Sequence, residues 1–335
     1  MKKIKYMFKL INKNTYKRLK NKINKVHEIY KRPKILIFFD MLWCMLIYQA
    51  GYTDYYSFGM YNMNHKQRKT ILTRGKNNSY VAKFNNKEYW HLFDNKNEFN
   101  EKYNKYLKRD WIYLKDKNIN DLNKFIKNKD YIIAKPNNDS GGNGIEKIKI
   151  NNFKTIKQLY NYLIKKNLLL LEDVVEQHNT LNKLNPSSVN TIRLITLKYN
   201  NKVHFITAFL RIGNNNNFVD NTASGGMLTM IDLSRGVTLF SAIDKNLKEY
   251  DKHPITKEKI KNIRIPYFNE TKQMIIELAK NIKEINYIAW DIAITNNGPV
   301  LIEGNPYPGY YYQFPIHTPN KIGIIPVFDK ILKNQ

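Results

Sequence analysis

The chain has 335 residues, enough to bury a substantial core in one large domain or two to three smaller ones. Its formal net charge of +28 attracts anionic partners, but no zinc-finger, RNP or helix-turn-helix pattern accompanies it, so we expect no specific nucleic-acid partner. The single Cys44 excludes an intramolecular disulfide and suits a reducing compartment. We therefore predict a cytoplasmic protein, or one that is peripheral to the inner face of a membrane.

The N-terminal segment is basic and helical in pattern. Residues 1–34 are rich in lysine, with apolar positions at helical spacing. The apolar run that follows, residues 35–51, is interrupted by Asp40 and is short for a membrane-spanning helix. We predict a packed helix here, and two alternatives stay open: peripheral contact of the basic helix with an anionic membrane surface, and a membrane anchor.

The rest of the chain mixes helical and strand patterns. Residues 79–107 predict a short hairpin and then a helix from about Lys96. Strands are expected around a glycine-rich turn at 130–150, at 168–177, on both sides of an Asn200-Asn201 turn, and in a hairpin at 290–306. Helices are expected at 151–167 and 266–285. Antiparallel strand pairs interleaved with helices predict an α+β fold.

The last hairpin places two acids together. A turn at Asn296, Asn297 and Gly298 sets Asp291 opposite Glu303, with Asn305 on the same face. Two half-buried carboxylates repel each other unless a cation lies between them, and Mg²⁺ favours oxygen ligands. We therefore predict a Mg²⁺ site at Asp291, Glu303 and Asn305; pairing of the acids with nearby lysines is the alternative.

Strict alternation along this hairpin also predicts which residues lie beside the acids. Leu301 should share the acidic face, whereas Val300 and Ile302 should join Ile292 on the core face.

The glycine-rich turn has the composition of a phosphate-binding loop. Glycines let backbone N–H groups close around phosphate oxygens, and the Lys135 ammonium on the preceding strand can reach the same phosphates. The loop residues are Ser140, Gly141, Gly142 and Gly144. A plain flexible turn is the alternative, and the spacing does not match a P-loop.

The apolar strand at 168–177 ends abruptly in acids. Glu172 and Asp173 could accept hydrogen bonds from a ribose, while backbone groups near Val174 read an adenine. A strand end with solvated acids is the alternative.

Two arginines lie on successive, otherwise apolar strands. A desolvated guanidinium needs an anionic partner, so Arg193 and Arg211 indicate carboxylate or phosphate binding, with structural salt bridges as the alternative. A second glycine-containing loop follows at 220–226.

Together these motifs resemble the ATP-grasp superfamily, in an order similar to ribosomal-protein glutamate ligase and glutathione synthetase. "AKPNNDSGGNGI", "NTIR", "LRIG", "VDNTASGG" and "WDIAITNNGPVLIEGNPYPG" are most similar to its sugar-transfer-associated group. The resemblance implies two α+β subdomains that clasp a nucleotide, preceded by the basic helical extension. The implied boundaries are an N-terminal extension at 1–55, a preceding region at 56–115, a small subdomain at 116–173 and a large subdomain with the Mg²⁺ site at 174–335.

The resemblance also implies the site. It implies ATP and Mg²⁺ as cofactors, with two ions and Mn²⁺ as an acceptable substitute, and the metal ligands Asp291, Glu303 and Asn305. Arg193 and Arg211 are the expected catalytic residues. The second basic triphosphate contact is nominated from Lys96, Lys108 and Arg109, with Lys96 preferred. The expected nucleotide contacts are Lys135, Ser140, Gly141, Gly142, Gly144, Glu172, Asp173, Val174 and Lys96, and the expected substrate contacts are His178, Asn190, Asn221, Gly225, Gly226 and Tyr307.

ATP-grasp chemistry implies an ADP-forming carboxylate–amine or carboxylate–nucleophile ligase that acts through an acyl phosphate. The expected partners are a small carboxylate and an amine or sugar-linked acceptor, from a cell-envelope sugar, polysaccharide or peptide precursor. A phosphotransferase and a non-catalytic polyanion-binding protein remain alternatives. The sequence does not indicate an oligomeric state.

Overall fold

A computed structural model describes residues 13–137, 144–214, 220, 225–309 and 320–333. The chain forms two compact units, Met1–Lys83 together with Gly309–Gln335, and Phe84–Pro308. We call them the helical unit and the two-sheet unit. The division differs from the expected boundaries, because the C-terminal residues belong with the N-terminal helices and residues 56–115 are shared between the units.

The helical unit has only helices among its described residues: α2 (Lys13–Tyr30), α3 (Lys34–Tyr48), α4 (Tyr52–Ser57), the 3₁₀ turn η1 (Met60–Asn62), α5 (His65–Lys69), α6 (Arg74–Phe84, whose last residue begins the other unit) and α13 (Ile325–Lys333). Asp40, which interrupts the apolar run of α3, accepts hydrogen bonds from Arg68 at 2.6 and 2.7 Å and from the Tyr55 hydroxyl at 2.7 Å. The ion pair explains an acid within an otherwise apolar helix.

The hairpin expected from residue 79 is wrong. Residues 74–84 form helix α6, and the Tyr80 ring stacks on Phe328 of α13 with centroids 4.4 Å apart. Packing against a distant helix overrides the local strand preference of this segment. Helix α8 does begin at Lys96, as predicted. No helix in the described part of the chain is both long enough and apolar enough to span a bilayer.

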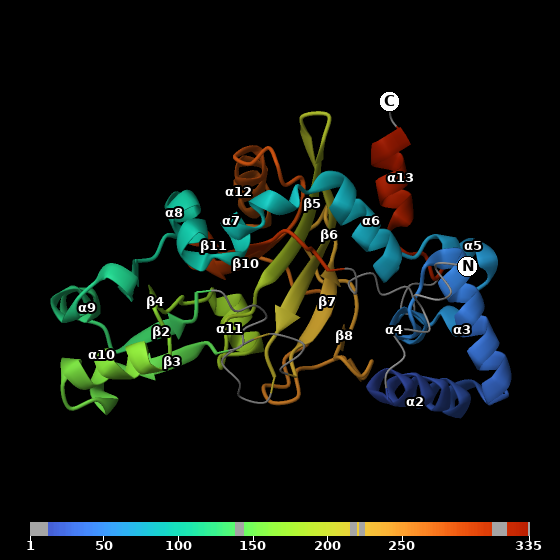
Figure 1. Ribbon diagram of the computed structural model, residues 1–335, viewed down its shortest axis with the longest axis horizontal. Coiled ribbons are helices and arrows are strands. Elements are labelled where there is room, and N and C mark those ends of the chain that lie inside the picture. The colour runs from blue at the N-terminus through green and yellow to red at the C-terminus, as the bar shows by residue number, and fades with distance from the viewer. Residues whose placement is uncertain (1–12, 138–143, 215–219, 221–224, 310–319, 334–335) are drawn as a thin grey trace. The chain divides into compact units, whose positions relative to one another are not determined.

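The smaller sheet of the two-sheet unit is antiparallel, in the order β1 (Trp111–Tyr113), β4 (Leu170–Asp173), β2 (Tyr131–Lys135) and β3 (Glu146–Lys149). Helices α9 (Ile119–Ile126) and α10 (Ile156–Lys165) lie beside it (Figure 1). Ile132 and Ala134 join their apolar core. Strand alternation therefore places Lys135, and Glu172 on β4, on the opposite face.

The larger sheet has seven antiparallel strands, in the order β11 (Gly298–Asn305), β10 (Tyr287–Thr295), β5 (Ile192–Tyr199), β6 (Lys202–Ile212), β7 (Met227–Ile231), β8 (Ala242–Ile243) and β9 (Glu249–Tyr250). Trp290, Ile292 and Leu194 join a core with helix α12 (Phe268–Lys280). The remaining helical elements of this unit are η2 (Lys87–Tyr89), α7 (His91–Asp94), α8 (Lys96–Leu107), η3 (Leu114–Asp116), η4 (Ile150–Asn152) and α11 (Asn179–Leu184).

The final hairpin has the predicted register at the acids but not along its whole length. Asp291 pairs with Glu303 as expected, and then Ile292 pairs with Leu301, which leaves Ile302 as the extra residue of a β-bulge. The bulge moves Leu301 to the core face with Ile292, so its predicted place beside the acids is wrong. The connection between the strands is the two residues Asn296 and Asn297, and Gly298, with φ +108°, begins β11.

Candidate functional site

The smaller sheet carries a buried carboxylate surrounded by donors. Glu172, 3% exposed, accepts hydrogen bonds from Lys135 Nζ at 2.7 Å, Arg109 Nε at 2.9 Å and Asn100 Nδ2 at 3.0 Å. Burial opposes ionisation, but the Arg109 and Lys135 charges outweigh it and hold the pKa of Glu172 well below its usual range. We call these four residues the Glu172 cluster. It has two cations for one acid, so it carries a net positive charge.

Arg109 connects this cluster to the metal-site hairpin. Its side chain is 4% exposed, and Nη1 donates to the Leu301 carbonyl oxygen on β11 at 2.6 Å. Glu303 follows Leu301 by two residues. Within the described part of the chain, Arg109 Nη2 is buried and has no hydrogen-bond partner. A buried guanidinium N–H without an acceptor is costly, which makes Arg109 Nη2 a candidate donor to an anion.

Lys96 has a different position from the one expected. Its Nζ donates to the carbonyl oxygens of Pro136 and Asn137, at 3.1 and 3.3 Å, and the Asn137 side chain accepts from Asn97 N at 3.0 Å. The start of α8 therefore fixes the chain where it enters the glycine-rich loop. Of the basic residues nominated as the second phosphate contact, Arg109 shares Glu172 with Lys135, whereas Lys96 binds the backbone directly after Lys135; the choice between them stays a prediction.

The other predicted nucleotide contacts have mixed positions. Ser140, Gly141 and Gly142 lie outside the described residues, and Gly144 begins the return of the loop with φ +70°. Both oxygens of Glu172 accept hydrogen bonds within the chain and hold Lys135 and Arg109 in place; its role as a ribose acceptor stays a prediction. Asp173 is 30% exposed and binds Lys129, and Val174 is partly exposed just beyond β4.

The larger sheet carries a second buried carboxylate. Arg193 binds both oxygens of Asp291, with Nε 2.6 Å from Oδ1, and Arg211 Nη1 lies 3.0 Å from Oδ2. The Asp291 side chain is only 2% exposed. Burial favours the neutral acid, but the two arginine charges outweigh it and lower the pKa of Asp291. Asp291 therefore gives both arginines an anionic partner within the chain, which agrees with the structural salt bridges predicted as the alternative.

Glu303 is the accessible member of the predicted metal set. Its side chain is 41% exposed, and its Oε1 lies 3.9 Å from Arg193 Nη2 and accepts a hydrogen bond from Asn305 Nδ2 at 3.2 Å. Burial and the neighbouring Asp291 charge raise the pKa of Glu303. Gly304, between Glu303 and Asn305, faces the other side of the strand. A larger residue would not fit there, because its Cβ would lie 2.6 Å from a ring carbon of Phe93. The structure thus brings Asp291, Glu303 and Asn305 together on one face.

Glu303 and Asn305, which are partly exposed, offer oxygen ligands of the kind that a hard divalent cation prefers. Both oxygens of Asp291 are bound by Arg193 or Arg211, so Asp291 would bind a cation only through its remaining lone pairs. Asp291 and Glu303 balance the charges of Arg193 and Arg211. Asp220 adds a further acid, 3.3 Å from Arg211 Nη2. We call Asp291, Glu303, Asp220, Arg193 and Arg211 the Asp291 cluster; three acids face two cations.

Two expected substrate residues have structural roles. Asn190 is fully buried; its amide donates to Gln177 Oε1 at 2.9 Å and its Oδ1 accepts from Gly213 N at 3.2 Å. His178 caps α11, since its Nδ1 accepts from Thr180 N at 3.1 Å. The polar groups of Asn190 are used within the fold, which leaves none for a substrate. His178 is partly exposed, and its contact with substrate stays a prediction.

The remaining substrate predictions lie around two loops. Asn221 lies outside the described residues. Gly225 and Gly226 lead into β7, with φ +100° at Gly225, and Tyr307 is 37% exposed just after β11. Strand β7 pairs with the strand that carries Arg211, and Tyr307 follows the strand that carries Glu303; the contacts of these three residues with substrate stay predictions.

Three members of the two clusters were not chosen as site residues from the sequence. Asn100 and Asp220 are single polar residues without a motif, and Arg109 was only one of three nominees. Asp220 is 8% exposed and binds Thr191 as well as Arg211. The only sequence feature that pointed to Asp220 was its position between a run of asparagines and the stretch "NTASGG".

The sequence matches one known protein family. Residues 75–331 match the family described as sugar-transfer associated ATP-grasp. The match covers more than half of the chain and includes every residue of the two clusters. No curated protein sequence matches the chain.

Solved structures with a similar fold are distant in sequence. N5-carboxyaminoimidazole synthetase from Staphylococcus aureus, complexed with ADP, has 15% identity and a TM-score of 0.41, over 64% of this chain and 45% of that one. D-alanine–D-alanine ligase from Helicobacter pylori has 16% identity and a TM-score of 0.41, over 71% and 63%. The ATP-grasp ligase PsnB, with its minimal precursor, has 10% identity and a TM-score of 0.44, over 75% and 64%. The chain covers less than two thirds of each of these proteins.

Proposed function

Because the chain belongs to the sugar-transfer-associated ATP-grasp family, we propose that it is an ATP-dependent, ADP-forming ligase that joins a carboxylate to an amine or another nucleophile. One observation supports this most directly. A positively charged cluster with an unpartnered guanidinium N–H is linked, through Arg109 and the Leu301 carbonyl, to a negatively charged cluster of oxygen ligands. Such a pair suits a nucleotide triphosphate at one cluster and its divalent cation at the other.

The Glu172 cluster would bind the phosphates. Lys135 and Arg109 provide two fixed positive charges. Glu172 holds both side chains in place and neutralises one of the two charges. Arg109 can add a directed N–H from Nη2, which a lysine cannot reproduce. The glycine-rich loop that follows β2 would supply backbone N–H groups to the same phosphates.

The Asp291 cluster would hold Mg²⁺ through Asp291, Glu303 and Asn305. When bound, the ion supplies charge neutralisation on the phosphate oxygens. Arg193 and Arg211 keep Asp291 ionised and oriented. Arg211, anchored between Asp220 and Asp291, lies on the sheet face where the transferring phosphoryl group and the substrate carboxylate would meet.

The proposed reaction has two steps. A carboxylate oxygen of the substrate attacks the γ-phosphorus of ATP, the bond to the β–γ bridging oxygen breaks, and ADP leaves. The amine nitrogen, or another nucleophile, then attacks the acyl carbon, inorganic phosphate leaves, and the nucleophile loses a proton. Enclosure of the acyl phosphate away from water is needed in between.

The family description supports a sugar-linked acceptor, of the kind found in cell-envelope sugar, polysaccharide or peptide precursors. The test is ADP release from MgATP, measured against panels of amino acids, uronic acids and nucleotide-activated sugars. We expect ADP and phosphate to appear in equal amounts with an amide or ester product. A stable phosphorylated acceptor with no free phosphate would instead identify a phosphotransferase, and no MgATP binding at all would contradict an ATP-dependent enzyme.

A further inference from the structure

Helix α3 presents a continuous apolar face that its own unit does not cover. Six large apolar side chains on it are between 47% and 59% exposed: Ile35, Leu36, Phe39, Trp43, Leu46 and Ile47. At 3.6 residues per turn they fall within an arc of about 120°. We call them the α3 apolar face. An exposed set of this kind on one helix marks an interaction site rather than scattered surface hydrophobics.

The opposite side of α3 is fixed in the core of the helical unit. Ile37, Met41, Cys44 and Tyr48 are buried there, none more than 5% exposed. The Asp40–Arg68 ion pair and the Tyr55 hydroxyl hold the helix at the edge of that buried side. The apolar face is therefore presented by a helix whose position is set by packing, and not by a loosely attached segment.

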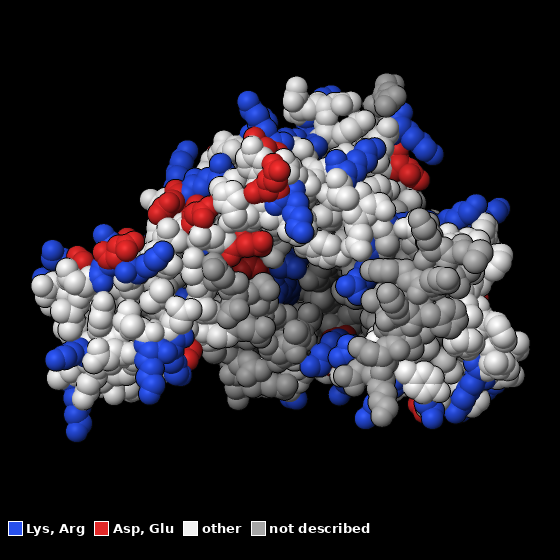
Figure 2. Space-filling model, viewed as in Figure 1, with Lys and Arg blue, Asp and Glu red and all other residues white. Residues whose placement is uncertain are grey.

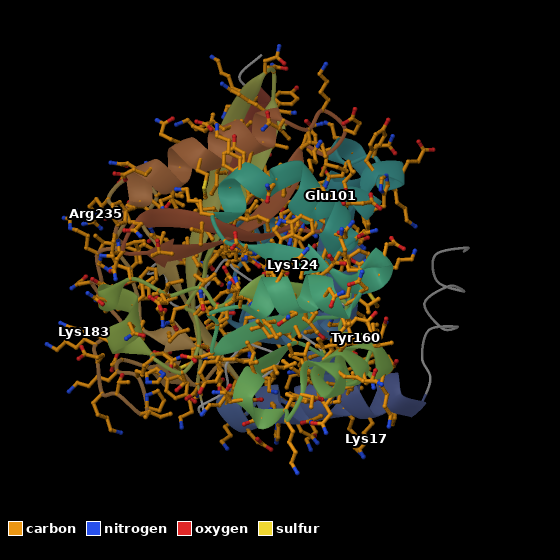
Figure 3. The ribbon with its side chains drawn as sticks, turned by 90° about the vertical axis from the view of Figure 1, so that its left-hand side faces the viewer. Lys17, Glu101, Lys124, Tyr160, Lys183 and Arg235 are labelled. Carbon is orange, nitrogen blue, oxygen red and sulfur yellow. The ribbon has the colours of Figure 1, made fainter. Side chains whose placement is uncertain are left out.

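Basic residues border the face. Lys31, Arg32 and Lys34 are exposed at the junction between α2 and α3, directly before Ile35. Exposed basic residues continue along α2 at Lys17, which is labelled in Figure 3, and at its neighbours Arg18 and Lys20. Glu28 is the only acid in α2. Figure 2 shows Lys and Arg side chains on the visible surface of the helical unit.

We propose that the α3 apolar face docks on an anionic lipid bilayer and lies in the plane of its interface. A 15-residue helix is about 22 Å long, too short to cross a hydrocarbon core of about 30 Å. An apolar face with Trp and Phe beside a basic border is the pattern of interfacial helices, in which the rings reach the headgroup level and the lysines bind acidic headgroups. The proposal is independent of the ligase assignment.

Charge favours this occupant over a second copy of the chain. A symmetric dimer through the α3 apolar face would supply no acidic groups for the basic border, because each copy offers the same surface. Each copy also carries a formal charge of +28, so the contact would place like charges against each other. An acidic lipid surface neutralises the same border.

The test uses the full chain and vesicles of phosphatidylcholine, with or without about one third phosphatidylglycerol. We expect co-sedimentation with the anionic vesicles only, and weakening by at least about tenfold as salt screens the contact. Trp43 is the exposed member of the four tryptophans, so its emission should shift to shorter wavelength on binding. The shift should disappear in Trp43→Phe while co-sedimentation persists.

The decisive variant is Leu36→Ser with Leu46→Ser, which removes apolar surface from exposed positions and leaves the buried side of α3 intact. We expect vesicle binding to fall at least about tenfold. Ile255→Ser, at a 48% exposed position in the two-sheet unit, is the matched control and should bind as the wild type does. Lys31→Gln with Lys34→Gln should weaken binding to anionic vesicles as well.

Three results would overturn the proposal. The first is equal binding by the double-serine variant and the wild type, and the second is equal binding to neutral and anionic vesicles. The third is a concentration-dependent dimer, measured by sedimentation velocity, that protects Trp43 while vesicles stay unbound. In that case the α3 apolar face would be a contact between copies.

Discussion

The Glu172 cluster and the Asp291 cluster are built alike and differ in sign. Each has a buried carboxylate held by two cations, on the face of its sheet opposite the helices that form the core. The Glu172 cluster ends with an excess positive charge and an N–H without a partner, whereas Glu303 and Asp220 give the Asp291 cluster an excess of acid. The same arrangement, a buried carboxylate held by two cations, therefore occurs in one cluster with an excess of positive charge and in the other with an excess of negative charge.

The comparison implies that Asp291 and Glu303 have separate tasks. Asp291→Asn should leave two buried arginines without their carboxylate and lower the free energy of unfolding by about 3–5 kcal/mol. Glu303→Gln removes an exposed acid beside another acid and should change stability by less than about 1 kcal/mol. Urea denaturation of the wild type, Asp291→Asn and Glu303→Gln measures both changes in the free energy of unfolding. Equal losses would mean that the two acids form one structural unit.

Glu303→Gln should nevertheless abolish most of the activity. Loss of one oxygen ligand should lower ADP formation from MgATP by about 100-fold, or about 2.7 kcal/mol of transition-state stabilisation. The matched control is Glu101→Gln on α8, where the acid is exposed (Figure 3). Unchanged turnover in Glu303→Gln, or an equal loss in the control, would end the assignment of Glu303 as a metal ligand.

Two substitutions distinguish the contribution of the Glu172 cluster to ATP binding from that of Lys96, which lies where the chain enters the glycine-rich loop. Arg109→Lys keeps the positive charge but loses the fork that reaches Glu172, Leu301 and the anion, so the KM for ATP should rise about tenfold. Lys96→Met removes donors to two carbonyl oxygens, and its KM should rise about threefold or less. The reverse order of effects would identify Lys96 as the second phosphate contact.

The smallest expected effect is on pH dependence, and it has opposite signs for Glu303 and Glu172. The pKa of Glu303 is raised, so its contribution to stability is present at low pH and is lost as pH rises through that pKa. In Mg²⁺-free buffer the wild type should therefore lose thermal stability relative to Glu303→Gln as pH rises, and Mg²⁺ should reverse the loss.

Glu172 should behave in the opposite way. Its pKa is lowered, so its contribution is present above the unfolded-state pKa and is lost as pH falls. The advantage of the wild type over Glu172→Gln should therefore shrink in acid. Thermal melts across the acidic range measure both pairs, and a common sign for the two would contradict the charge difference between the clusters.

Local pattern determined much of the molecule. The helix at Lys96, the Asn200-Asn201 turn, the α12 helix and the pairing of Asp291 with Glu303 were all predicted, because turn residues and apolar periodicity act over a few neighbouring residues. The placement of Asp291, Glu303 and Asn305 on one face, and of Lys135 on a strand, was predicted for the same reason. Each lies within one hairpin or one strand.

Tertiary structure alone decided what those residues contact. The bulge at Ile302, the helix at 74–84 and the burial of Asn190 depend on packing against segments far away in the chain. Arg109 reaches β11 across 192 residues, and Arg193 reaches Asp291 across 98. A buried charge takes whichever partner the fold brings within hydrogen-bonding distance, and sequence spacing carries no information on a contact of that length.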